Sequence, residues 1–137
     1  MRYCFFEVDG VLNTSKDWKI QMYSLQPKLV DNFCKYLIKH KYEPVLISSW
    51  RAGFIEPNHS DNSPQIKRLE KMMAERGIVL KFKTPILKGR TRDAEIERFL
   101  YYNPAENYVI IDDDRTEYAK TSDQNVFIDC NRGFNLK

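Results

Sequence analysis

The segment from Cys4 to Asn13 constrains the fold of this chain more than any other stretch. It reads as a short apolar strand that ends in two acidic residues, Glu7 and Asp9, followed at once by Gly10. Side chains alternate along a strand, so the two carboxylates are expected to point to the same side. Burying a strand that carries two carboxylates at its C-terminal end costs free energy unless the carboxylates bind something.

The rest of the chain alternates between predicted strands and predicted helices. Proline is favoured in the first turn of a helix and serine as its capping residue, so Pro27 and Ser63-Pro64 mark helix starts. Strands are expected at 3–8, 44–47, 78–82, 108–111 and 125–128. Helices are expected over 27–40, from 64 to Gly77 and from Thr91 to Pro104, with loops or a small flap at 10–25, 52–63 and 84–90. This order predicts an α/β fold with a five-stranded parallel sheet and helices on both faces.

Length and composition limit the possible classes of protein. The chain has 137 residues, 42% of them apolar, which suits one compact domain over 1–137. A net charge of +3 permits an anionic ligand but does not by itself argue for nucleic acid. Three widely spaced cysteines do not form a disulfide framework, and no stretch approaches the length of a membrane span. We therefore expect a cytoplasmic protein without membrane association, in an oligomeric state that the sequence leaves open.

Polar side chains follow three of the predicted strands. Glu7 and Asp9 follow the first, Ser48 and Ser49 the second, and an acidic run at 112–114 the fourth. In an open parallel sheet these strand ends share one crevice. Carboxylates gathered there repel one another unless a cation lies between them, and Mg²⁺ prefers oxygen ligands. An acidic run alone is usually a solvated turn, but its position beside the other strand ends predicts a metal site.

These motifs resemble those of the haloacid dehalogenase-like (HAD) superfamily of phosphotransferases, particularly the small members found in RNA-repair and polynucleotide-end-processing proteins. The resemblance runs from Phe5 to Phe134, and Ser-Ser-Trp-Arg at 48–51 is its most specific local likeness to the small subgroup. The four superfamily motifs are matched in order by Glu7 to Leu12, by Ser48 with Ser49 as the alternative, by Arg92 with Lys88 as the alternative, and by Asp112-Asp113. The resemblance implies a three-layer, Rossmann-like HAD fold, and the short segments at 10–25 and 83–90 leave room for only a minimal cap.

The resemblance also implies an activity, that of a Mg²⁺-dependent phosphomonoesterase that forms an acyl phosphate. The first-motif carboxylate attacks phosphorus, and Asp9 protonates the leaving oxygen and then activates water. The implied catalytic residues are Glu7, Asp9, Ser48 and Arg92, the substrate-binding residues Gly10, Ser49, Arg51 and Lys88, and the Mg²⁺ ligands Glu7, Asp9, Asp112 and Asp113. The implied partner is a phosphorylated small molecule, such as a nucleotide, or a nucleic-acid end.

One residue departs from the superfamily pattern, because the nucleophile position holds Glu7 where the motif has aspartate. Glutamate carries the same charge, but its carboxylate lies one methylene further out. Misplacement on the order of 1 Å can cost about a hundredfold in rate. Three readings follow: Glu7 is a working nucleophile in an adjusted pocket, the chain is a phosphate- or partner-binding relative without turnover, or Glu7 is an engineered, disabling substitution.

Two further points concern nucleic-acid binding and an alternative class of protein. Trp18, Tyr23 and Trp50 lie near the expected mouth of the crevice, where they either stack on bases or simply pack. A response-regulator-like receiver would share the acidic strand ends, but the pattern of the first strand fits that plan poorly. We therefore rank the phosphomonoesterase first, the silent binding module second and the receiver last.

Overall fold

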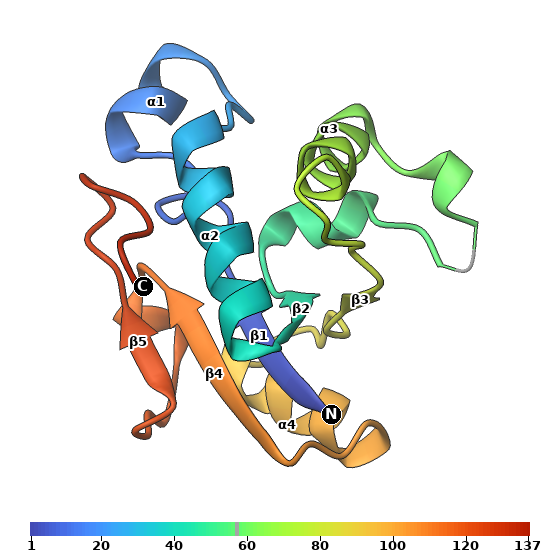
Figure 1. The fold of residues 1–137 in the computed structure, drawn as a ribbon. Coiled ribbons are helices and arrows are strands. Elements are labelled where there is room, and N and C mark those ends of the chain that lie inside the picture. The colour runs from blue at the N-terminus through green and yellow to red at the C-terminus, as the bar shows by residue number, and fades with distance from the viewer. Residues whose placement is uncertain (57) are drawn as a thin grey trace.

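The computed structural model describes residues 1–56 and 58–137. Within them lies a five-stranded sheet in the order β3-β2-β1-β4-β5, and every neighbouring pair of strands is parallel (Figure 1). The strands are β1 Arg2–Phe6, β2 Glu43–Leu46, β3 Phe82–Lys83, β4 Asn107–Asp112 and β5 Asn125–Phe127. The predicted α/β class and the parallel sheet are confirmed, with β1 at the centre.

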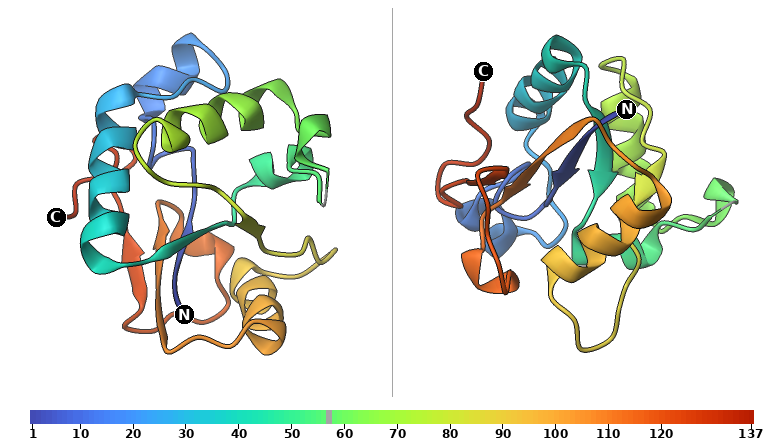
Figure 2. Two further views of the ribbon diagram at one scale, coloured as in Figure 1. Left: turned by 45° about the vertical axis from the view of Figure 1, so that its right-hand side comes forward. Right: turned by 90° about the horizontal axis from the view of Figure 1, so that it is seen from below.

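Helices cover both faces of this sheet (Figure 2). The α-helices are α1 Ser15–Ile20, α2 Pro27–His40, α3 Pro64–Ala74 and α4 Arg92–Tyr102, and the 3₁₀ helices are η1 Ser49–Gly53, η2 His59–Asp61 and η3 Arg115–Glu117. Alternate residues of β1 face opposite layers, so Phe6 packs with α2 and α3 while Phe5 packs with α4. This arrangement confirms the predicted three layers.

The helix starts follow the local sequence signals. Pro27 begins α2, and the Ser63 side chain caps α3 by accepting the N–H of Ile66. Thr91 precedes α4, but its side chain makes no capping hydrogen bond. Ile38 of α2 is 55% exposed, whereas Val30, Phe33 and Leu37 are buried against the sheet.

The predicted flap at 10–25 contains a helix that the periodicity did not reveal. In α1 the Thr14 side chain accepts the N–H of Asp17, while the Asp17 carboxylate accepts the N–H of Thr14. This capping box was the available signal. Helix η2 lies within the predicted loop at 52–63, whose residue 57 lies outside the described residues.

Two strand predictions were wrong in their bounds. The first strand ends at Phe6, not at residue 8, because the chain turns and the Val8 carbonyl accepts the N–H groups of Val11 and Leu12. The carboxylates after β1 are therefore placed by a turn and not by strand alternation. The third strand comprises Phe82–Lys83 alone, whereas residues 78–81 lie outside the sheet.

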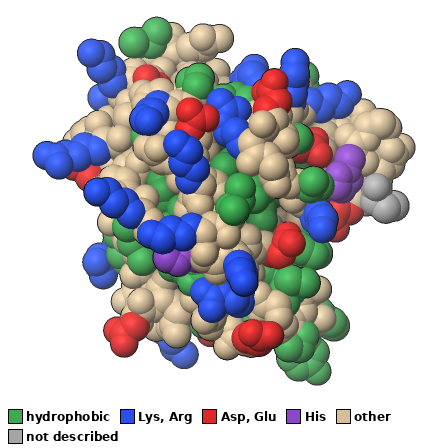
Figure 3. Space-filling view, viewed as in Figure 1, with side chains coloured by type: hydrophobic (Ala, Val, Ile, Leu, Met, Phe, Trp, Pro, Cys, Tyr) green, Lys and Arg blue, Asp and Glu red, His purple; other side chains and the backbone are tan. Residues whose placement is uncertain are grey.

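Two general features bear on function. Figure 3 shows Lys and Arg side chains scattered over the face that carries α2, with acidic side chains among them, in keeping with the small net charge. Across the described ranges no helix combines the length and the apolar character that crossing a membrane requires.

Candidate active site

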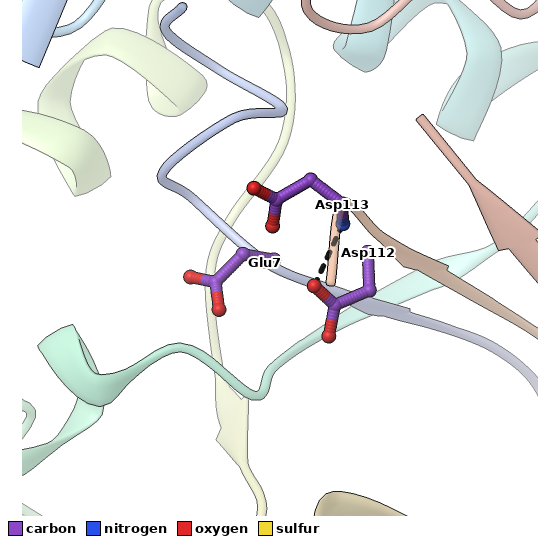
Figure 4. Close-up of side chains that lie close together, drawn as sticks. All are labelled: Glu7, Asp112 and Asp113. Carbon is purple, nitrogen blue, oxygen red and sulfur yellow. Dashed lines mark hydrogen bonds between the residues drawn. The ribbon is translucent and has the colours of Figure 1, made fainter. Parts of the chain in front are cut away.

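The two central strands bring three carboxylates together. Phe6 of β1 lies in register with Ile111 of β4, and the N–H of Glu7 donates to the Ile111 carbonyl at 2.9 Å. Glu7 therefore follows its strand beside the end of β4, where Asp112 and Asp113 stand. Each of these three residues offers a carboxylate oxygen, and the three oxygens lie within 4.8 Å of one another (Figure 4). Such a group can hold a metal ion.

Asp112 is fully buried and its carboxylate is fully hydrogen-bonded. One oxygen accepts the N–H groups of Asp113 and Asp114 at 2.7 and 3.1 Å. The other accepts the Tyr118 hydroxyl and Arg92 Nη1, both at 2.7 Å. A carboxylate has about four acceptor positions. A metal ion that bound Asp112 would therefore displace one of these donors.

Tyr118 lies beneath this carboxylate and was not predicted from the sequence. Its side chain is 8% exposed, and burial, with the charge of Asp112, raises its pKa, so the hydroxyl remains a donor.

Tyr118→Phe should lower the free energy of unfolding by about 2 kcal/mol, because a buried charge loses a hydrogen bond. Tyr101→Phe is the matched control: Tyr101 is 78% exposed, and its loss should cost under about 0.5 kcal/mol. Urea unfolding measures both, and equal losses would contradict this role for Tyr118.

Arg92, the first residue of α4, is the cation among these carboxylates. Its Nη1 forms ion pairs with both Glu7 and Asp112. Burial would lower the pKa of the guanidinium, but the two carboxylates outweigh burial and raise it. Lys88, the alternative for the third motif, is exposed and does not line the cavity described below. Of the two candidates, the structure brings Arg92 into the site.

Glu7 is 5% exposed and held from several sides. Its Oε1 accepts the N–H of Val8 at 2.8 Å, and its Oε2 pairs with Arg92. Burial raises the pKa of Glu7, and Arg92 and a hydrogen bond from Ser48 counteract that rise. Ser48 is itself buried and caps η1, with Oγ accepting the N–H of Trp50 at 3.1 Å. The second-motif serine thus contacts the first-motif carboxylate.

Asp113 carries the most perturbed carboxyl group of the three. Burial raises its pKa, and hydrogen bonding and charge from Asp112, then the charge of Glu7, raise it further, to about 7. The glycine at position 10 makes this crowding possible: its φ is +84°, and a Cβ there would lie 2.3 Å from Asp113 Oδ2. Arg92 pairs with two of the three carboxylates, those of Glu7 and Asp112, and the donor set fits a hard cation with oxygen ligands.

These groups open into a cavity of about 370 Å³. It is lined by Glu7, Asp9, Trp18, Met22, Tyr23, Ser49, Arg92, Asp113 and Asp114. Asp9 stands in its wall but outside the group of three carboxylates. Trp18 and Tyr23 also lie in the lining, as the sequence predicted for the mouth, whereas Trp50 packs in the core. A larger cavity of 600 Å³ between β3 and α4 has one acidic residue, Glu56, among its lining residues.

Arg51 does not reach this cavity, contrary to its predicted role in substrate binding. It is 5% exposed, and its Nη2 pairs with Glu95 Oε1 at 2.7 Å. Its remaining bonds run to the backbone carbonyls of Ile47, Ser48 and Thr84. Arg51 therefore links η1 to α4 through a buried ion pair with Glu95. This ion pair helps to fix the end of α4 that carries Arg92.

Comparison with known proteins adds a family to this geometry. The family described as "HAD domain in Swiss Army Knife RNA repair proteins" matches residues 3–137, nearly the whole chain. The search of curated proteins found no match to this chain.

Proposed function

Since this chain belongs to the family of HAD domains in Swiss Army Knife RNA repair proteins, we propose that it is a Mg²⁺-dependent phosphomonoesterase. We propose that it acts as a single domain over 1–137, in the cytoplasm, on the phosphate of a nucleotide or of a nucleic-acid end. One observation carries the proposal: Glu7, Asp9, Arg92 and Asp113 line the same cavity at the ends of β1 and β4. A nucleophile, an acid–base group, a phosphate-binding cation and a metal ligand are thereby within reach of one substrate.

Glu7 and Asp113 are the proposed principal ligands of Mg²⁺, with Asp112 orienting them and Asp9 beside them. Burial, and then the neighbouring carboxylates of Asp112 and Glu7, raise the pKa of Asp113, and this crowding of buried carboxylates supports a cation at this position. When bound, Mg²⁺ would offset the negative charge on the phosphoryl oxygens.

The residues of the chain divide the reaction into two displacements at phosphorus. The Glu7 carboxylate forms a bond to phosphorus as the ester P–O bond breaks, and Asp9 gives its proton to the departing alkoxide. Water then attacks the same phosphorus and Asp9 takes its proton. The bond between phosphorus and the Glu7 oxygen breaks, which releases inorganic phosphate. Arg92 holds the phosphoryl oxygens during both steps, together with Ser49, the alternative second-motif serine, which lines the same cavity.

The pKa of Asp113 predicts how Mg²⁺ binding depends on pH. The folded protein holds this proton more tightly than the unfolded chain, so the metal-free fold loses stability as the pH rises from about 4 to about 7. Mg²⁺ would offset the buried negative charge that causes this loss, and it would compete with the proton at low pH. The rise in Tm on adding Mg²⁺ should therefore be larger at pH 8 than at pH 5.

Thermal unfolding with Mg²⁺ or EDTA at both pH values measures this difference. Asp113→Asn should remove it, whereas Asp123→Asn, an exposed carboxyl outside the cavity, should leave it intact. The same Mg²⁺ shift at both pH values in the unmodified protein would contradict Asp113 as a ligand.

A binding module without turnover is the second candidate, and one observation favours it. The Glu7 carboxylate is paired with the guanidinium that a substrate phosphate needs, so nucleophile and phosphate compete for Arg92. A silent domain would still bind phosphate-bearing ligands and gain Tm from them.

Phosphate release separates the two candidates. The substrates should include nucleoside monophosphates, sugar phosphates, and oligonucleotides with a 5′- or a 3′-phosphate, each with Mg²⁺ and with EDTA. Mg²⁺-dependent release from any of them supports the phosphomonoesterase. Ligand-induced stabilisation without release from any of them would favour the binding module instead.

A further inference from the structure

The Asp9 carboxylate is held by two N–H donors from different parts of the chain. Asn13 Nδ2 donates to Oδ1 at 3.0 Å, and Trp50 Nε1 donates to Oδ2 at 3.2 Å. One donor lies in the loop after β1 and the other in η1. Each carboxylate oxygen has about two acceptor positions, so one remains on each for a proton.

Both donors are themselves fixed in place. Asn13 is fully buried, and its Oδ1 accepts the N–H of Gly10 at 2.9 Å while its Nδ2 also donates to the Ser24 carbonyl at 2.8 Å. Trp50 is 3% exposed, and the ring of Tyr23 meets it edge-on with centroids 5.4 Å apart. The indole has a single N–H and accepts no hydrogen bond, so Trp50 can only be the donor to the Asp9 carboxylate.

We propose that Trp50 is a positioning residue for Asp9, and that its indole N–H holds the carboxylate in the orientation from which it protonates the leaving oxygen. This proposal rests on the phosphomonoesterase function proposed above. Trp50 also donates its backbone N–H to the Ser48 hydroxyl, which contacts Glu7. One short element thus supports both the nucleophile and the acid.

The leaving group distinguishes positioning of an acid from a merely structural role. An alkoxide needs a proton to depart, whereas p-nitrophenolate departs without one. Trp50→Phe removes the N–H and keeps an aromatic ring. It should lower kcat/KM for glycerol phosphate by about tenfold or more, because a charged group loses a hydrogen bond. It should leave kcat/KM for p-nitrophenyl phosphate within about threefold of the unmodified value.

The measurement is made in the unmodified chain and in Glu7→Asp, and circular dichroism verifies folding. Asn13→Asp is the second variant, because it keeps the acceptor for Gly10 and removes the donor to Asp9. It should likewise lower kcat/KM for glycerol phosphate much more than kcat/KM for p-nitrophenyl phosphate. Equal losses for both substrates, or none, would overturn the role of Trp50 while leaving the phosphatase intact. Absence of release from either substrate in both backgrounds would overturn the phosphatase and the role of Trp50 with it.

NMR tests the hydrogen bond between Trp50 and Asp9 without any need for turnover. The chain has two tryptophans, so the spectrum contains two indole N–H signals to assign. The indole resonances are assigned with Trp18→Phe and Trp50→Phe. Asp9→Asn should move the Trp50 N–H resonance upfield and leave that of Trp18 in place. An unmoved Trp50 resonance would refute the hydrogen bond.

Discussion

Asp9→Asn should reduce kcat/KM for alkyl phosphomonoesters by about 10²–10⁴-fold. The amide is close in volume to the carboxylate but has no proton to give to the leaving oxygen. It also takes none from water in the second step. Phosphate release in the presence of Mg²⁺ is the readout, in the unmodified chain and in Glu7→Asp.

The position of Asp9 makes this loss specific. Asp9 lies in the cavity wall, outside the group formed by Glu7, Asp112 and Asp113, so the variant keeps those three carboxylates. Asp123→Asn, at an exposed carboxyl outside the cavity, is the control and should retain full activity. Retention of kcat/KM in Asp9→Asn would mean that another group, or solvent, supplies the proton.

The parts of the fold that could be predicted from sequence are those with local signals. Pro27 and the Ser63-Pro64 pair begin α2 and α3 where expected, because capping and the first turn depend on adjacent residues. The two-residue β3 could not be placed in the same way. It is defined by pairing with β2 at the sheet edge, and the apolar run at 78–82 resembles a strand without such pairing.

In the candidate site too, some residues could be predicted from sequence motifs and others could not. Glu7 and Asp113 are brought together as the motif order predicted, because parallel strand ends share one edge of the sheet, and Arg92 reaches them from the first turn of α4. Tyr118 and Asn13 were missed, since each acts through a contact that no sequence pattern announces. The resemblance placed Arg51 in the substrate site, but Arg51 lies in a 3₁₀ turn and pairs with Glu95 inside the protein.

Glu7→Asp should raise the rate of phosphate release by about a hundredfold, through the position of one carboxylate. Shortening the side chain by one C–C bond, about 1.5 Å, withdraws the carboxylate toward β1. In the present site Glu7 Oε2 pairs with Arg92, which also holds Asp112. The shorter side chain loosens this pair, which frees the guanidinium for the phosphoryl oxygens and places the nucleophile where the superfamily motif has it.

Initial rates with Mg²⁺ on the most reactive phosphomonoester measure this gain, with Glu97→Asp on the exposed face of α4 as the matched control. That control should leave the rate unchanged. A slower Glu7→Asp would show that the pocket is adjusted to glutamate, so that the pairing with Arg92 orients the attack instead of hindering it. A protein inactive with either residue, yet stabilised by phosphate-bearing ligands, would be the binding module. The comparison therefore separates the three interpretations of Glu7, because a faster Glu7→Asp, a slower Glu7→Asp and no release with either residue each support a different one.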